Sequence, residues 1–244
     1  MIRRPPRSTQ SRSSAASDVY KRQIVVSKSY EAIEAPFIYI NGGITDITAT
    51  NDAINATKGL VSGGTEQNDG SCLYVTGGIL IASCTNGDAI DSNGDILITG
   101  GLTIANGPSN GIEEAVDFNG IFNMNGGIFI GAGSNSNMTK PMSNSSTQPN
   151  MFISSSSLIS SSTFLNIQIN STDVITFKPK YGGYKFLISS PDMTKGASYK
   201  IYTGGSYSTS INTGGYYTGG TYTPGNLKKS GTLSLSSTVN TINL

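Results

Sequence analysis

The residues of this sequence best suited to chemistry are the carboxylates of four short acidic turns. Each turn reads acid, Ala, Ile or Val, then acid or amide. The four are Glu31–Glu34, Asp52–Asn55, Asp88–Asp91 and Glu114–Asp117. Ca²⁺ takes about six to eight oxygen ligands from carboxylates, amides and carbonyls. The turns therefore predict a calcium site, provided that the fold brings them together.

A strand ending in a glycine pair accompanies the turns. It occurs as Ile38–Gly43, Leu73–Gly78, Ile96–Gly101 and Phe122–Gly127. Every second residue before the glycines is apolar, which is typical of a strand with one buried face. We expect these alternate residues to point inward: Ile38, Ile40, Leu73, Val75, Ile96, Ile98, Phe122 and Met124.

The spacing of these units predicts the fold. Successive acidic turns begin 21, 36 and 26 residues apart, and the longest interval contains a polar run of 14 residues, Lys58 to Ser71, that we interpret as an insertion. A period in the low twenties, built of strands and glycine corners, is typical of a solenoid whose repeats stack into one core. The sequence predicts an all-β parallel β-helix over residues 24–133. The face taken by the strand after each glycine pair stays open, because Ile44-Thr-Asp-Ile and Leu102-Thr-Ile-Ala suit different registers.

Stacking would place the acidic residues in two columns. The predicted metal ligands are Glu31, Asp52, Asp88 and Glu114 in the first column, and Glu34, Asn55, Asp91 and Asp117 in the second. Strands about 4.8 Å apart would bring like charges close enough to repel by roughly 3 kcal/mol at an effective dielectric of 20. Such columns need bound cations, raised pKa values or strongly splayed side chains, and we favour bound calcium. The alternative is that these are solvated turn residues, since Asp and Asn are common in turns.

The repeat stops after Gly133. Residues 134–150 have the composition of a loop. Strand candidates follow near 164–170, 174–178, 184–189, 198–203 and 232–239, with a Tyr- and Gly-rich tract between the last two. Because a solenoid needs its open end covered, we expect residues 151–244 to form a C-terminal β cap.

The first 23 residues do not follow the pattern. They hold all five arginines and have no apolar periodicity. They resemble translated sequencing-adaptor read-through, and the alternative is a disordered basic tail. We expect a non-native, disordered segment in either case. It contains no apolar stretch of a secretory signal.

Charge separates the rest of the chain into two parts. Residues 24–133 have twelve acids against Lys28 and Lys58, a net charge of −10, whereas residues 134–244 have two acids and eight lysines, a net charge of +6. Acidic repeats are opposite in sign to a nucleic-acid-binding surface. No apolar run approaches the roughly 20 residues of a membrane span.

Cys72 and Cys84 flank a glycine corner, and we expect them to be unpaired small apolar side chains.

Several motifs together carry a family resemblance. They are SYEAIEA, INGGITDITATNDAINA, GDAIDSNGDILITGG, SNSSTQPN and ISSPDMTKGASYKIYTGG. In this order the chain resembles the secreted carbohydrate-binding, polysaccharide-lyase-like β-helix family of the clostridial cellulose- and pectin-binding type. The resemblance implies a right-handed, pectate-lyase-like parallel β-helix, bound calcium, binding of cell-wall polysaccharide, and a secreted or cell-surface location.

One departure from that family concerns the acidic turns. They carry Ala32, Ala53, Ala89 and Ala115 where the family commonly has glycine. If that glycine uses a positive φ, alanine would be strained in its place.

Three function classes remain. The first, which we favour, is a monomeric, non-catalytic, calcium-dependent module that binds plant cell-wall polysaccharide such as cellulose or polygalacturonate. The candidate rings for stacking on sugars are Phe37, Tyr39, Tyr74 and Phe129, and the alternative for each is packing between the coils. The second is a pectin-active lyase or hydrolase, and the third is a structural adhesin. We predict no catalytic residues, because a lyase needs a base and residues 24–244 contain neither Arg nor His.

Overall fold

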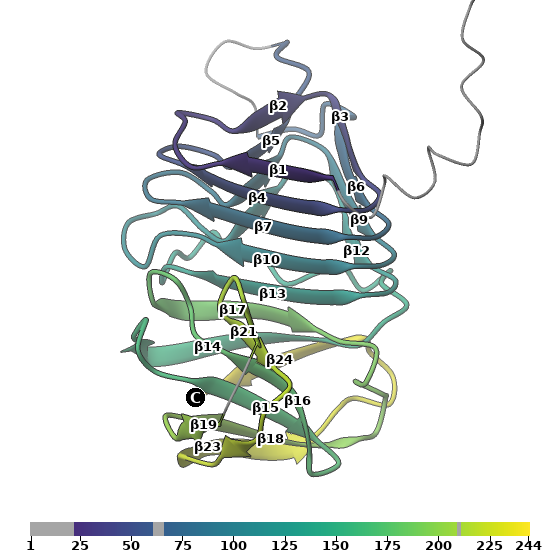
Figure 1. Ribbon diagram of the computed structural model, residues 1–244. Helices are drawn as coiled ribbons and strands as arrows, with labels where there is room; N and C mark the ends of the chain where they lie inside the picture. The colour runs from purple at the N-terminus through teal and green to yellow at the C-terminus, as the bar shows by residue number, and fades with distance from the viewer. Residues whose placement is uncertain (1–21, 61–65, 209–210) are drawn as a thin grey trace, which may run out of the picture.

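The computed structural model describes residues 22–60, 66–208 and 211–244, and these form β-strands without any helix (Figure 1). The predicted all-β class is confirmed. Within those ranges there is accordingly no helix of the length and apolarity needed to cross a membrane.

Three parallel sheets lie beside one another along the repeats, and each repeat contributes one strand to each sheet (Figure 1). The first sheet contains β2 (Ile33–Ala35), β5 (Ile54–Ala56), β8 (Ile90–Ser92) and β11 (Val116–Phe118). The second contains β3 (Phe37–Ile40), β6 (Cys72–Val75), β9 (Asp95–Ile98) and β12 (Phe122–Met124). The third begins with β1 (Gln23–Val26), β4 (Ile44–Ala49), β7 (Ile79–Cys84), β10 (Leu102–Asn106) and β13 (Ile128–Gly133).

The glycine pairs form the corner between the second and third sheets. The second glycine of each pair has a positive φ: 74° at Gly43, 81° at Gly78 and Gly101, and 80° at Gly127. A Cβ added at Gly127 would lie 2.6 Å from the carbonyl oxygen of Gly101 in the neighbouring repeat. Only glycine combines this backbone conformation with so close an approach.

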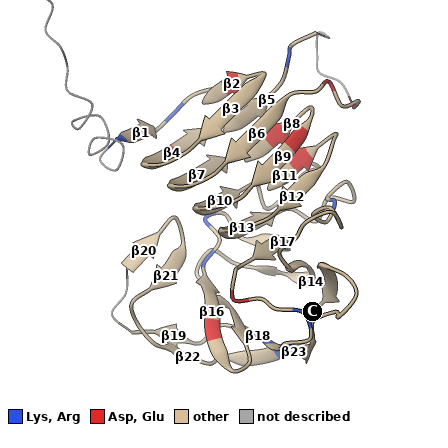
Figure 2. Cartoon of the chain, turned by 90° about the vertical axis from the view of Figure 1, so that its right-hand side faces the viewer, with Lys and Arg blue, Asp and Glu red and all other residues tan. Residues whose placement is uncertain are grey.

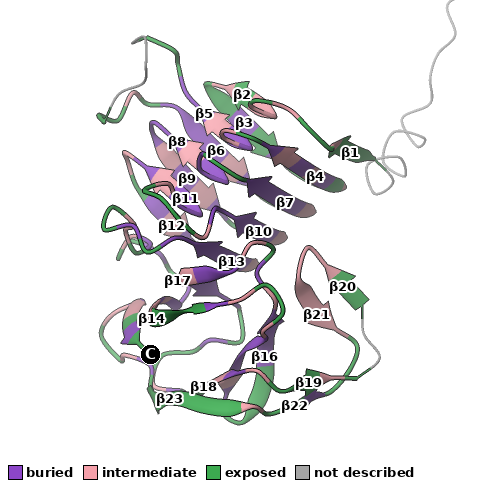
Figure 3. Cartoon of the chain, turned by 90° about the vertical axis from the view of Figure 1, so that its left-hand side faces the viewer, coloured by how far each residue is buried: buried purple, intermediate pink, exposed green. Residues whose placement is uncertain are grey.

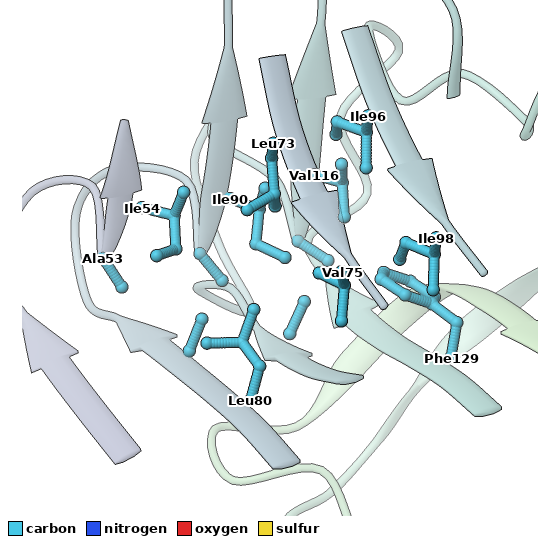
Figure 4. Packing of buried hydrophobic residues seen from close by; sticks show 14 of the residues in the cluster. Ala53, Ile54, Leu73, Val75, Leu80, Ile90, Ile96, Ile98, Val116 and Phe129 are labelled. Carbon is cyan, nitrogen blue, oxygen red and sulfur yellow. The ribbon is translucent and has the colours of Figure 1, made fainter. Parts of the chain in front are cut away.

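The interior between the three sheets is aliphatic (Figure 4). The eight side chains predicted to point inward are all buried, and the most exposed of them is Ile40 at 7%. Ile54, Ile90 and Val116 face them from the first sheet, each fully buried. Every repeat thus completes the core of its neighbours, as stacking requires.

The third sheet is buried on both of its faces in its middle part. Thr45 and Ile47 point into the interior, while Asp46 pairs in register with Ile81, which belongs to a second apolar cluster with Ile104. This settles the open register. The two apolar patterns differ because β7, β10 and β13 have a second layer packed on their outer face. The corresponding outer residue of β4 is Asp46, which is partly exposed and does not belong to that apolar cluster.

The second layer comes from the C-terminal part of the chain. The third sheet continues as β17 (Gly183–Ser189), β14 (Asn150–Ile159) and β24 (Val239–Asn243), with β17 antiparallel to β13. A six-stranded sheet holds β15 (Leu165–Ile169), β16 (Thr172–Phe177), β18 (Ser198–Thr203), β20 (Ile211–Thr213), β21 (Tyr216–Thr218) and β23 (Asn226–Thr232). Strands β19 (Ser206–Tyr207) and β22 (Tyr222–Thr223) form a two-stranded ribbon.

Two sequence-based predictions were wrong in this part. The strand expected near 232–239 is instead the gap between β23 and β24, and β14 was not predicted. The sequence did not predict β14 because the centre of this strand, Ser154–Ser157, shows no apolar alternation.

Residues 134–149 contain no strand, but they are not a free loop. The amide of Ser143 donates to the carbonyl of Phe122, and the amide of Gln148 donates to that of Met124. This segment therefore covers the edge of β12, which has no further parallel strand beside it.

At the other end, residues 1–21 of the predicted tail lie outside the described residues. Gln23 was placed in that tail, whereas it pairs in register with Ile44 as the first residue of β1. The sequence did not indicate that Gln23 belongs to β1, because a strand of four residues is too short to show apolar alternation.

Candidate functional site

The four acidic turns stack directly on one another. The amide of Ala32 donates to the carbonyl of Asp52 at 3.3 Å, that of Ala53 to Asp88 at 3.2 Å, and that of Ala89 to Glu114 at 3.4 Å. Among the described non-glycine residues only Asn170 and Ser171 have a positive φ. The turn alanines are therefore unstrained, and the methyl groups of Ala53 and Ala89 are fully buried.

The second column of the predicted ligands is in register. Glu34 pairs with Asn55, Asn55 with Asp91, and Asp91 with Asp117, all in the centres of three-residue strands of the first sheet. The residues on either side, such as Ile90 and Ser92, are buried, so these four side chains point outward. Figure 2 shows acidic residues gathered over this sheet.

Two carboxylates of the first column link consecutive turns. Oδ1 of Asp52 accepts a hydrogen bond of 2.8 Å from the amide of Asp88. Oδ1 of Asp88 accepts one from the amide of Glu114. Glu31 is held differently, by the side-chain amides of Asn51 at 3.3 Å and Asn55 at 3.4 Å. The first column thus has a structural role besides any role in binding.

Burial and mutual repulsion make several of these carboxyls weak acids. Burial, together with the neighbouring Asp52 carboxylate, raises the pKa of Asp88 to about 9 and that of Asp91 to about 8. Burial also raises the pKa of Glu114 to about 7 and that of Asp52 to about 6. Asp88 and Asp91 therefore hold their protons near neutral pH unless a cation replaces them.

Glu114 is the most isolated of these groups. It is 2% exposed, and neither carboxyl oxygen has a hydrogen-bond partner among the described residues. The nearby hydroxyls of Ser136 and Thr139 lower its pKa, but not enough to offset burial. An acceptor buried without a partner costs about 1–3 kcal/mol, or more if charged, so Glu114 marks a position where a cation would be stabilising.

The predicted ligands divide between two adjoining cavities. The first, of about 300 Å³, is lined by five of them: Asp52, Asp88, Asp91, Glu114 and Asp117. The second, of about 450 Å³, is lined by Glu31, Glu34, Asp52, Asn55 and Asp91. Asp52 and Asp91 belong to both cavities, which makes them the centre of the site.

Sequence reasoning missed other polar residues of these cavities. Both are lined by Asn51 and Asn93, and the first also by Glu66, Glu113 and Asn119. Asn51 and Glu113 each directly precede a predicted ligand, so a search of the turn flanks could have found them. Glu66 comes from the long insertion, and nothing in the sequence indicated where that segment lies.

The donor set suits a hard cation, because carboxylate and amide oxygens predominate and no histidine or thiolate lines either cavity. In the described part of the chain, however, no three acidic or cysteine side chains converge as metal ligands. Binding would therefore require side chains to rotate toward the ion. For Glu114, this rotation would take the carboxylate away from the neighbouring hydroxyls of Ser136 and Thr139.

One lysine lies at this site. Nζ of Lys140 is 3.1 Å from the carboxylate of Asp117 and donates to the carbonyl of Phe118 at 2.6 Å. It also lies 4.9 Å from the centre of the Phe118 ring. Lys140 neutralises one carboxylate at the edge of the site and leaves the others without an ion pair among the described residues.

The predicted surface rings have different positions. Phe37 is 50% exposed and Tyr39 is 59% exposed, and the ring of Tyr39 stacks on that of Tyr74 with centroids 4.7 Å apart and an angle of 4° between planes. These rings lie on the outer face of the second sheet, not beside the acidic cavities.

The prediction for Phe129 was wrong. Its ring is fully buried and packs edge to face against Phe122 at 5.0 Å. It occupies an inward position of β13, in register with Thr103, where the strand after the glycine pair faces the interior.

Both cysteines are free and buried, as expected.

Comparison of the chain with protein-family models, with curated proteins and with solved structures gives no match.

Proposed function

We propose that this protein is a calcium-dependent, non-catalytic binder of plant cell-wall polysaccharide. In this proposal residues 24–133 form a right-handed parallel β-helix, residues 151–244 cap it, and the protein acts as a secreted or cell-surface monomer. The right-handed sense follows the strong preference of connections between parallel strands of one sheet.

The observation that carries the calcium proposal is Glu114. It is buried at a cavity that six other carboxylates line, and neither of its oxygens has a hydrogen-bond partner among the described residues. Asp88 accepts a main-chain hydrogen bond with only one oxygen, which leaves its second oxygen for a cation. Asp52 accepts one bond with each oxygen, from the amide of Asp88 and from the side chain of Asn51 at 3.3 Å. Ca²⁺ supplies positive charge that the surrounding residues, apart from Lys140, do not.

The polysaccharide proposal is supported by the rings on the second sheet. Tyr39 and Tyr74 cover one face of each other, so a sugar would meet the opposite ring face, the ring edges and the hydroxyls. Phe37 extends this exposed aromatic area two residues earlier on β3. For an acidic glycan, calcium in the acidic cavities would also bridge to sugar carboxylates.

A pull-down tests both parts. Purified protein is incubated with insoluble cellulose and with immobilised polygalacturonate, in excess Ca²⁺ and in chelator. We expect retention that chelator reduces and that the double variant Tyr39→Ala/Tyr74→Ala weakens. Leu235→Ala, which removes a 78% exposed apolar side chain elsewhere, is the matched control. Equal recovery with and without either polymer would exclude the proposal and favour the adhesin.

The second candidate function is that of a lyase, and the observation that favours it is the position of Lys140. A lyase needs a metal to acidify the proton beside the uronate carboxylate and a base to remove it, and Lys140 lies at the edge of the acidic cavities. Its ion pair with Asp117 and its bond to Phe118 hold it as a charged donor, which disfavours a role as base.

A further inference from the structure

A separate cavity lies between the third sheet and the hairpin of β20 and β21. Figures 1 and 3 show this hairpin beside the outer face of the sheet. The cavity has a volume of about 350 Å³, which is near the lower end of the range of about 300–1,000 Å³ for small-molecule sites. It has room for a ligand of the size of a monosaccharide.

The walls of this cavity are fixed by contacts between distant parts of the chain. At the hairpin tip Gly214 has a φ of 57°, and a Cβ there would meet Ile81 at 3.0 Å and Ile104 at 3.1 Å. The amide of Lys178 donates to the carbonyl of Gly215 at 2.8 Å. The hairpin is thereby held against the sheet, and the cavity is a property of the fold.

The cavity has an excess of positive charge. Lys178 and Lys180 line it together with one acid, Asp46, and neither lysine lies within ion-pair distance of a carboxylate among the described residues. Nζ of Lys178 is 4.1 Å from the centre of the Phe164 ring and 5.8 Å from that of Tyr217. These contacts position the ammonium group without neutralising it.

The floor of the cavity holds an unsatisfied donor. Oδ1 of Asn106 accepts a hydrogen bond of 3.1 Å from the amide of Lys180, which fixes the orientation of the side-chain amide. Its Nδ2 has no acceptor among the described residues, although the residue is only 1% exposed. Buried donors are normally paired, so an acceptor at this floor is the missing element.

We propose that this cavity binds a sugar acid, with its carboxylate at the two lysines and its hydroxyl groups at the remaining polar side chains. The excess of positive charge favours an anion. A bare inorganic anion is disfavoured because Asp46 would repel it, whereas a sugar hydroxyl can donate to that carboxylate. Ser161 and Asn212 offer further hydrogen-bonding groups for hydroxyls. The site contains no carboxylate pair and works without calcium.

The test is calorimetric titration of the full chain in chelator with glucuronate, glucose and inorganic sulfate. We expect glucuronate to bind at least 10-fold more tightly than either of the others. Lys178→Met and Lys180→Met should each weaken glucuronate binding about 10-fold, since each removes a charge and keeps most of the aliphatic stem. Lys228→Met, on the exposed strand β23, should change nothing.

Two results would overturn this proposal. One is equal affinity for glucuronate and glucose, because the lysines would then contribute nothing. The other is equal affinity for sulfate and glucuronate, because the hydroxyl contacts would then be absent. Circular dichroism of the variants distinguishes lost binding from lost folding. The use of chelator separates this test from that of the calcium proposal, since failure of one leaves the other standing.

Discussion

The main-chain amide of Asp88 donates a 2.8 Å hydrogen bond to the carboxylate of Asp52, a residue 36 positions earlier in the chain. The next turn repeats the arrangement, with Glu114 donating to Asp88. One oxygen of each carboxylate thus links two repeats, and both residues line the acidic cavity. Under the calcium proposal, the first column of acids would couple the stacking of the repeats to binding of the ion.

We predict that Ca²⁺ raises the melting temperature. A site filled at a free concentration about 100 times its dissociation constant adds about 2.7 kcal/mol, or roughly 5–10 °C for a chain of this size. Differential scanning calorimetry in Ca²⁺ and in chelator measures the shift. Asp88→Asn combined with Asp91→Asn should remove most of it, while Asp192→Asn, on an exposed turn, should leave it intact. Identical melting curves in both buffers would rule out calcium as a stabilising ligand.

In chelator, stability should fall as the pH rises. The pKa of Asp88 and of Asp91 lies at about 9 and 8 in the folded protein, above the ordinary value of 3.8. Below about pH 4 both carboxyls are protonated in the folded and unfolded chains, and their contribution is fully present. Between about pH 4 and 9 the unfolded chain releases protons that the folded chain retains, so the free energy of unfolding decreases.

Melting curves from pH 5 to 9 test this sign. The metal-free protein should melt at its highest temperature near pH 5, and Asp88→Asn should flatten the dependence. Excess Ca²⁺ should oppose the trend, because the ion binds the ionised carboxylates. A metal-free melting temperature that climbs steadily toward pH 9 would contradict the raised pKa values.

Truncation to alanine should cost far more stability at Phe129 than at Phe37. Phe129 is fully buried against Phe122, so Phe129→Ala should cost about 3–5 kcal/mol by lost burial and a residual cavity. Phe37 is 50% exposed, and Phe37→Ala should lie within about 0.5 kcal/mol of the parent protein. Urea denaturation followed by circular dichroism measures both values. Similar costs for the two variants would show that the assigned faces of β3 and β13 are wrong.

The repeats were predictable from the sequence because their pattern is local. Ile96 and Ile98 alternate within one strand, and Gly100 and Gly101 mark its end. The register of the acidic turns followed from the period alone. Phe129 was misplaced because its strand follows the corner, where both neighbours, Ile128 and Ile130, are also apolar and no alternation reveals the inward face.

The cavities were harder to predict, since they depend on contacts between distant segments. Asp46 and Ile81 are in register, yet only the second is covered by the C-terminal layer. Nothing in the sequence near Lys180 indicates that its ammonium group reaches Thr48 of β4, to which it donates a hydrogen bond of 3.1 Å. Asp88 likewise lies between turns that are distant in sequence, since it is hydrogen-bonded both to Asp52 and to Glu114.

The last prediction is that the protein binds polysaccharide without cutting it. The chain has no histidine, and its arginines all lie in the first 23 residues. The lysine nearest the acidic cavities, Lys140, is held by Asp117 and Phe118. Inverting hydrolysis would need one carboxyl as acid and another as base, about 6.5–9.5 Å apart with room for a water. Asp52 and Asp88 are instead tied to the amides of the next turn.

The assay is incubation with polygalacturonate and Ca²⁺, following the absorbance of unsaturated ends for lyase activity and reducing sugar for hydrolysis. We expect neither signal to exceed that of a buffer control. Lys140→Met should leave that background unchanged, and it should cost little stability because the pair with Asp117 is partly exposed. A rate above background that Lys140→Met abolishes would identify a lyase, whereas one lost only in Asp88→Asn/Asp91→Asn would identify a metal-dependent or carboxylate-driven hydrolase.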